Sequence, residues 1–105
     1  MVQIGNQTFR LADIITIRTE DHYLGIQTAK GKFMQRAKLS DVVGLHGSDL
    51  GMQINRSVWV AFSAITSVEN ADSGQIVLKL ANGDEERVAK PRVFAFRQLY
   101  RDAQA

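Results

Sequence analysis

Apolar and polar residues alternate along most of the chain, which is typical of strands with one buried face. The clearest case is the segment in which Ile76, Leu78 and Leu80 share one parity. The dipeptide Asn82-Gly83 follows it, and this pair strongly favours a tight hairpin turn. The same reasoning predicts strands at residues 8–11, 14–19, 22–28, 32–37, 52–62, 64–70, 75–80 and 85–88.

Two segments have helical spacing instead. Residues 39–45 carry apolar side chains on one side, with Ser40 and Asp41 in the first turn, and predict a short internal helix. Pro91 suits the first turn of a second helix because its φ is fixed, and apolar residues recur at helical spacing from Val93 to Ala103. We therefore predict a mainly β fold of small antiparallel sheets, with one short internal helix and one C-terminal helix.

The composition fits one compact domain over residues 1–105. The chain has 105 residues, of which 45% are hydrophobic, and no repeat or linker divides it. Its apolar runs are far shorter than the roughly 20 residues that span a bilayer, and its start lacks the features of a secretory signal. The absence of cysteine excludes disulfides and thiolate metal sites within this chain. These features favour a cytoplasmic location.

Signatures of catalysis are missing from the sequence. There is no glycine-rich phosphate loop, and the serines and histidines form no recognisable nucleophile motif. The two histidines, His22 and His46, cannot supply the three or four ligands of a zinc site. We therefore predict no enzyme activity, no cofactor, no bound metal and no small-molecule substrate.

Cationic side chains are spaced for one face of a strand at residues 32–38. By period-two alternation Lys32, Arg36 and Lys38 point the same way, with Met34 among them. A row of cations at this spacing can follow a phosphate backbone. A solvated face, or an edge strand protected by lysine, explains the same pattern, and the residues alone favour this second interpretation.

Arg56 interrupts an otherwise apolar segment, between Asn55 and Ser57. A guanidinium group in such a segment must leave the core or find a partner. One interpretation is that it points outward and binds a base edge or a phosphate in a bidentate manner. The other is a structural ion pair with the acidic residues 84–86, and the residues do not decide between the two.

Lys90 and Arg92 flank Pro91 just before the predicted terminal helix. Cations are unfavourable at a helix N-terminus, whose free N–H groups attract anions. The arrangement is accounted for if a phosphate binds there. The alternative is a pair of exposed charges, whose cost is only about 0.3–1 kcal/mol.

Four motifs follow one another between about residue 9 and about residue 99: ITIRTEDHYL at 15–24, GKFMQRAKL at 31–39, INRSVWVA at 54–61 and RVAK at 87–90. Their order resembles that of the LytTR (LytR/AlgR-type) DNA-binding domains. The first two match the family's opening strand with its tyrosine and the hairpin return, and the last two resemble its His-Arg-Ser and Val-Ser-Arg motifs. The chain departs from the family in having Asn55 for histidine, Ala61 for asparagine and Ala89-Lys90 for Ser-Arg.

This resemblance implies an elongated fold that recognises double-stranded DNA through loops rather than a recognition helix. The loops enter successive major grooves of a bent site, with two copies of the domain on a repeated site. His22 and Arg56 are then the leading candidates for base contacts, and Lys90 or Arg92 takes the place of the family's arginine. The strand-face cations are added as phosphate contacts. The candidate DNA-binding residues are His22, Asn55, Arg56, Lys90, Arg92, Lys32, Arg36 and Lys38.

The resemblance also implies a bacterial transcriptional regulator, in which such a domain is the output of a two-component system. A receiver or sensor domain then acts in cis or in trans, and the parent protein is cytoplasmic or tethered to a membrane with this domain in the cytoplasm. The modest net charge of +2 leaves an alternative, in which the β-module binds or senses proteins without DNA. An unrelated RNA-binding barrel is a weaker alternative, because the aromatic residues lie mostly in apolar patterns.

Overall fold

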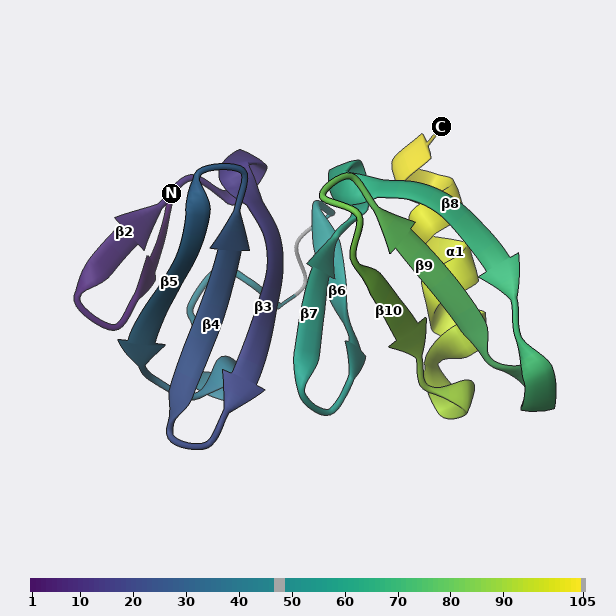
Figure 1. Cartoon of the computed structure of the whole chain (residues 1–105), viewed down its shortest axis with the longest axis horizontal. Coiled ribbons are helices and arrows are strands. Elements are labelled where there is room, and N and C mark those ends of the chain that lie inside the picture. The colour runs from purple at the N-terminus through teal and green to yellow at the C-terminus, as the bar shows by residue number, and fades with distance from the viewer. Residues whose placement is uncertain (47–48, 105) are drawn as a thin grey trace.

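Three antiparallel sheets and a C-terminal helix make up the fold, in a computed structural model that describes residues 1–46 and 49–104. Figure 1 shows the five-stranded sheet and the three-stranded sheet side by side, with the two-stranded hairpin at one end. The strand order is β5-β4-β3-β7-β6 in the larger sheet and β10-β9-β8 in the smaller one. The strands are β1 (Val2–Ile4), β2 (Gln7–Phe9), β3 (Ile14–Glu20), β4 (Tyr23–Thr28), β5 (Gly31–Arg36), β6 (Gly51–Asn55), β7 (Val58–Ala61), β8 (Ile65–Asn70), β9 (Ile76–Leu80) and β10 (Glu85–Val88).

Single turns of 3₁₀ helix connect many of these strands, and one α-helix ends the chain. The helix α1 (Val93–Gln104) lies behind the three-stranded sheet in Figure 1. The ring of its Phe96 stacks on Tyr100 with centroids 5.3 Å apart and meets Phe62 edge-on. The 3₁₀ turns are η1 (Leu11–Asp13), η2 (Leu39–Asp41), η3 (Phe62–Ala64), η4 (Asp72–Gly74) and η5 (Lys90–Arg92).

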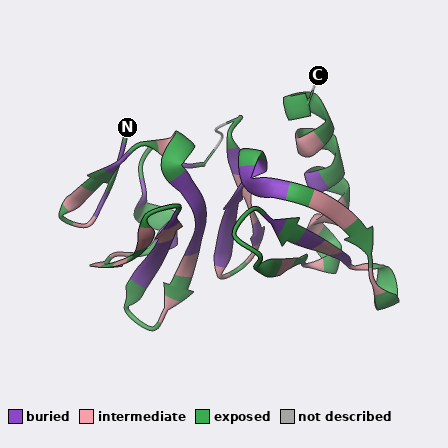
Figure 2. Ribbon diagram, turned by 45° about the horizontal axis from the view of Figure 1, so that its top comes forward, coloured by how far each residue is buried: buried purple, intermediate pink, exposed green. Residues whose placement is uncertain are grey.

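The core runs through the inner faces of both larger sheets. Trp59 on β7 is fully buried, as are Ile17 on β3, the central strand of the larger sheet, and Leu78 on β9, the central strand of the smaller one. Figure 2 shows buried positions concentrated in these central strands and exposed positions in the connecting turns. The turns are therefore free to carry polar side chains while the strands hold them in place.

The prediction of a mainly β fold with small antiparallel sheets and a C-terminal helix is confirmed. The predicted internal helix at 39–45 is wrong in extent, because only the single turn η2 forms. Val42 is already extended, and Gly44 has a φ of +87°, which a helix does not allow. The missed strand β1 pairs with β2 and buries Val2 and Ile4.

The single strand predicted at 52–62 is also wrong, because the chain reverses within it. β6 and β7 form a hairpin whose turn is Arg56-Ser57. The Asn55 side-chain oxygen accepts a hydrogen bond from the backbone N–H of Ser57 at 2.9 Å, which closes the turn. At the other end of the chain, α1 begins at Val93 rather than at Pro91, which lies in η5.

Gly51 offers a test of the packing between β6 and β7. A Cβ at this position would clash with the carbonyl oxygen of Val60 and with the indole ring of Trp59, and neither of these buried groups can move away easily. We expect Gly51→Ala to lower the free energy of unfolding by about 1–3 kcal/mol, measured by chemical denaturation. Gly25→Ala is the matched control, because there the added atom meets only the flexible ends of Glu20 and Lys32. Equal losses in the two variants would contradict this packing.

Candidate nucleic-acid interface

Three connections lie along one edge of the molecule, at the bottom of Figure 1. They are the β3–β4 turn at residues 21–22, the β6–β7 turn at residues 56–57, and η5. Antiparallel pairing produces this arrangement, because alternate turns of adjoining hairpins fall on the same side of a sheet. We call this side of the molecule the triple-turn edge, and it carries residues from distant parts of the sequence.

A groove of about 480 Å³ opens at this edge and brings four of the predicted residues together. His22 comes from the β3–β4 turn, Arg36 from the end of β5, Lys38 from the segment after β5, and Arg56 from the β6–β7 turn. The groove also contains two carboxylates, those of Asp21 and Asp41, so it is cationic without being uniformly so.

The cationic side chains of the groove are free to bind a ligand. His22, Lys38 and Arg56 are exposed, and their side chains form no hydrogen bond or ion pair with the described part of the chain. Arg36 lies over the ring of Tyr23, with its guanidinium carbon 6.0 Å from the ring centroid. This cation–π contact holds Arg36 on the groove side while leaving its N–H groups available.

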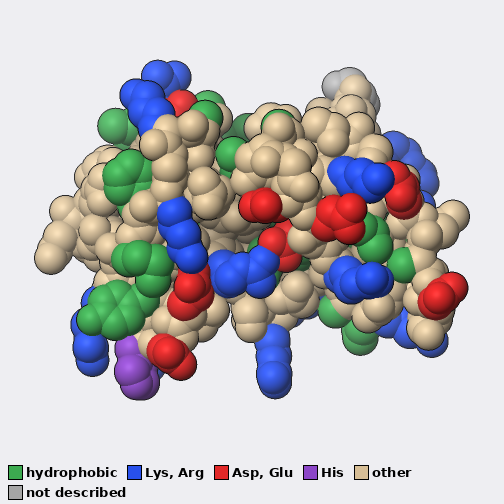
Figure 3. Space-filling view, in the orientation of Figure 1, with side chains coloured by type: hydrophobic (Ala, Val, Ile, Leu, Met, Phe, Trp, Pro, Cys, Tyr) green, Lys and Arg blue, Asp and Glu red, His purple; other side chains and the backbone are tan. Residues whose placement is uncertain are grey.

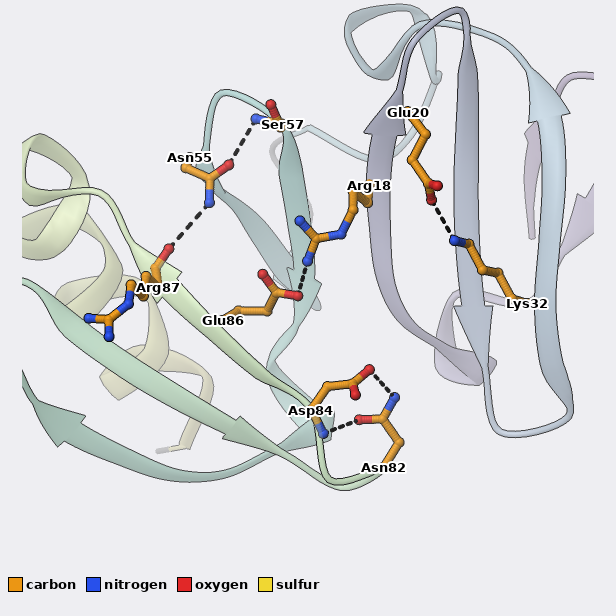
Figure 4. Close-up of polar contacts among 9 residues, drawn as sticks. All are labelled: Arg18, Glu20, Lys32, Asn55, Ser57, Asn82, Asp84, Glu86 and Arg87. Carbon is orange, nitrogen blue, oxygen red and sulfur yellow. Dashed lines mark hydrogen bonds and ion pairs between the residues drawn. The ribbon is translucent and has the colours of Figure 1, made fainter.

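The ion pair considered for Arg56 is not formed within residues 1–46 and 49–104. Arg18 on β3 is the partner of Glu86 on β10 instead, as Figure 4 shows. Glu86 is 10% exposed, so its carboxylate sits in the junction between the two larger sheets rather than on the surface. Arg56 is therefore left pointing outward from its turn.

Asn55 and Arg92 have their polar groups engaged inside the protein. The Asn55 amide donates to the carbonyl oxygen of Arg87 at 3.2 Å, and its oxygen accepts from Ser57, so it ties the β6–β7 turn to β10 (Figure 4). The Arg92 guanidinium donates to the carbonyl oxygen of Gln53 at 2.9 Å, which joins η5 to β6. Both residues hold turns of the triple-turn edge in position.

Lys32 and Lys90 lie outside the groove. Lys32 points from the same face of β5 as Arg36, as the alternation predicted, but it forms an ion pair of 2.7 Å with Glu20. Lys90 is exposed in η5, and its side chain passes close to Gly74 in η4. Of the predicted cations, Arg36, Lys38 and Arg56 therefore line the groove, Lys32 is paired with Glu20, and Lys90 lies apart on η5.

Positive charge is concentrated in parts of the surface and does not cover the whole molecule. Figure 3 shows acidic and cationic side chains mixed near the centre of the visible face. Lys, Arg and His side chains project along its lower edge, with an acidic side chain beside the His. Sequence reasoning named most of these cations but assigned no role to Asp21, although this residue adjoins His22 in the same turn. The contact between Arg18 and Glu86 was also missed, because 68 positions separate the two residues.

The described residues contain no group of three or more side chains suited to hold a metal ion. Nor does any helix among them have the length and apolar character needed to cross a membrane.

Comparison with known proteins agrees with the geometry. A solved structure from Bacillus cereus, described as the LytTr DNA-binding domain of a methyl-accepting/DNA response regulator, superposes with a TM-score of 0.79 at 15% identity, over 94% of each chain. At this identity the similarity concerns the fold. No curated protein sequence matches the chain. The family model of the LytTr DNA-binding domain matches residues 7–101, nearly the whole chain. The chain therefore belongs to the LytTr DNA-binding domain family.

Proposed function

We propose that this chain binds double-stranded DNA in a sequence-specific manner and regulates transcription, with the triple-turn edge as its contact surface. The observation that carries the proposal is the groove, in which His22, Arg36, Lys38 and Arg56 converge with free polar groups. Three of these side chains are cations, and the groove holds only two carboxylates, so an excess of positive charge remains for an anion to neutralise. A nucleic-acid backbone supplies the anion, and base edges supply partners for the histidine and the guanidinium groups.

The dimensions of the domain support contacts with two successive major grooves. Its longest axis measures 38 Å, while one turn of B-DNA advances roughly 34–36 Å. The β3–β4 turn belongs to the five-stranded sheet, and η5 follows β10 of the three-stranded sheet, so the two lie apart along the triple-turn edge (Figure 1). Loops in these positions can therefore enter neighbouring grooves. The β6–β7 turn, whose Arg56 lines the same groove as His22, can present its guanidinium group to a base edge beside the β3–β4 turn.

The roles of the side chains follow from their chemistry and position. Arg56 is suited to bidentate recognition of guanine, and His22 offers both a donor and an acceptor to a base edge. Arg36 and Lys38 follow the phosphate backbone, and Lys90 contacts phosphate or base at the far end of the edge. In this proposal Asn55 and Arg92 act by positioning the turns, and Lys32 adds a partly neutralised charge.

We further propose that the domain acts as the output of a bacterial, cytoplasmic regulator, with two copies on a repeated site. The response-regulator origin of the structure from Bacillus cereus supports this assignment. In such a protein a receiver or sensor domain, in the same chain or in a partner, would control access to DNA. A single domain with a groove of this size reads only a short half-site, so a second copy would add both affinity and specificity.

Arg56→Ala tests the proposed base contact. On the duplex that the wild-type chain selects from a random library, we expect a loss of about 1–3 kcal/mol in binding free energy and relaxed preference at one position. The measurement is a fluorescence titration at fixed salt. Arg101→Ala is the matched control, because Arg101 is equally cationic but lies exposed on α1. Unchanged binding by Arg56→Ala, or an equal loss in the control, would refute the assignment.

Lys38→Ala tests the proposed phosphate contact in a different way. Loss of one phosphate contact should weaken binding to all duplexes to a similar extent and reduce the slope of log K against log salt by about 0.9. Titrations of cognate and scrambled duplexes across several salt concentrations give both quantities. A slope equal to that of the wild type would place Lys38 outside the phosphate contacts.

A further inference from the structure

Asp21 is an unexplained charge at the tip of the triple-turn edge. It lies beside His22 in the β3–β4 turn and lines the same groove as Arg36, Lys38 and Arg56. Its carboxylate is exposed and forms no hydrogen bond or ion pair with the part of the chain that the structure describes. Three cations of the groove could neutralise it, yet it pairs with none of them.

The conformation of the turn does not require an aspartate. Asp21 has a φ of 58°, in the left-handed region, which glycine and asparagine adopt at least as readily. The β3–β4 register closes at Glu20 and Tyr23, so the turn consists of Asp21 and His22 alone. The charge itself is therefore dispensable for the fold.

A carboxylate is costly on a surface that binds phosphates, because like charges repel. The cost is avoided when the side chain faces a base edge that carries a hydrogen-bond donor. In the major groove cytosine presents its N4 amino group, whereas guanine presents two acceptors and thymine an acceptor and a methyl group. Adenine presents its N6 amino group next to the acceptor N7, which repels a carboxylate placed against both atoms. An ionised aspartate only accepts hydrogen bonds, so it fits cytosine best and rejects guanine and thymine.

From this placement we infer that Asp21 is a specificity-determining residue, which selects a C·G pair by accepting a hydrogen bond from cytosine N4. The inference rests on the proposed function, because it assigns one base preference to the turn that also carries His22. Asp21 thus acts as an attractive contact for one base and a repulsive one for two others, which is how a site with few contacts gains discrimination.

The test is the variant Asp21→Asn, which keeps the shape and the left-handed conformation but removes the charge. Asparagine pairs with adenine through N6 and N7, so the preferred base should change from cytosine to adenine at a single position. Binding-site selection from random duplexes is carried out with the whole chain and its variant. Titrations on duplexes that differ at that one pair should then show a 5- to 150-fold change in relative affinity, the fold-change that about 1–3 kcal/mol represents.

Asp41→Asn is the matched control, because Asp41 is an exposed carboxylate in the same groove. Loss of its charge should affect all sequences alike and leave the base preferences as they are. If Asp21→Asn behaves in the same way, Asp21 is a solvated charge and the inference fails while the proposed function stands. If the folded wild-type chain selects no sequence at all, the proposed function fails and the inference falls with it.

A second substitution, Asp21→Gly, tests the loss of the carboxylate without introducing the side-chain amide of asparagine. Glycine suits the positive φ at this position and presents no side chain to the base. We expect it to lose the preference for cytosine without gaining one for adenine. Retention of the cytosine preference in Asp21→Gly would overturn the inference.

Discussion

The fold depends on the contact between β6 and β10, where the five-stranded and three-stranded sheets meet. The backbone N–H of Ala89 donates to the carbonyl oxygen of Ile54 at 3.0 Å, and Ile54 is fully buried beside it. The side chains of Asn55 and Arg92 add hydrogen bonds on either side of this point. Two small sheets that touched only through apolar side chains could slide, whereas directional bonds at the junction fix their relative orientation.

The hydrogen bonds at this junction distinguish two groups of residues: those that hold the triple-turn edge in place and those whose side chains are free to contact DNA. Asn55 and Arg56 are neighbours in sequence, yet the first is bonded within the protein and the second points outward. Arg18 similarly neutralises Glu86 between the sheets. Substitution of a residue that holds the edge in place, such as Asn55, should therefore displace a whole turn. Substitution of a residue with a free side chain, such as Arg56, should remove a single interaction.

The sequence predicts what local patterns encode. The alternation of β9, the Asn82-Gly83 turn and the cationic face of β5 all depend on near neighbours, and the structure has them as expected. The turn at Arg56 was missed because the apolar residues on both sides of it fit a single strand, and the hydrogen bond from Ser57 to the Asn55 side chain that helps close the turn has no hydrophobic signature. Which cations stay free depends on partners far away in the sequence, such as Glu20 for Lys32, and no local pattern reveals them.

The proposed role of this domain requires that the triple-turn edge is the surface that meets DNA. The most direct measurement is nuclear magnetic resonance of the isotope-labelled chain during titration with its selected duplex, followed residue by residue. We predict the largest changes in backbone chemical shift at residues 21–22, 36–41 and 56–57 and in η5, with small changes in the turns on the opposite edge. Changes concentrated on that opposite edge, at the β4–β5 and β9–β10 turns, would show that DNA binds elsewhere than the triple-turn edge.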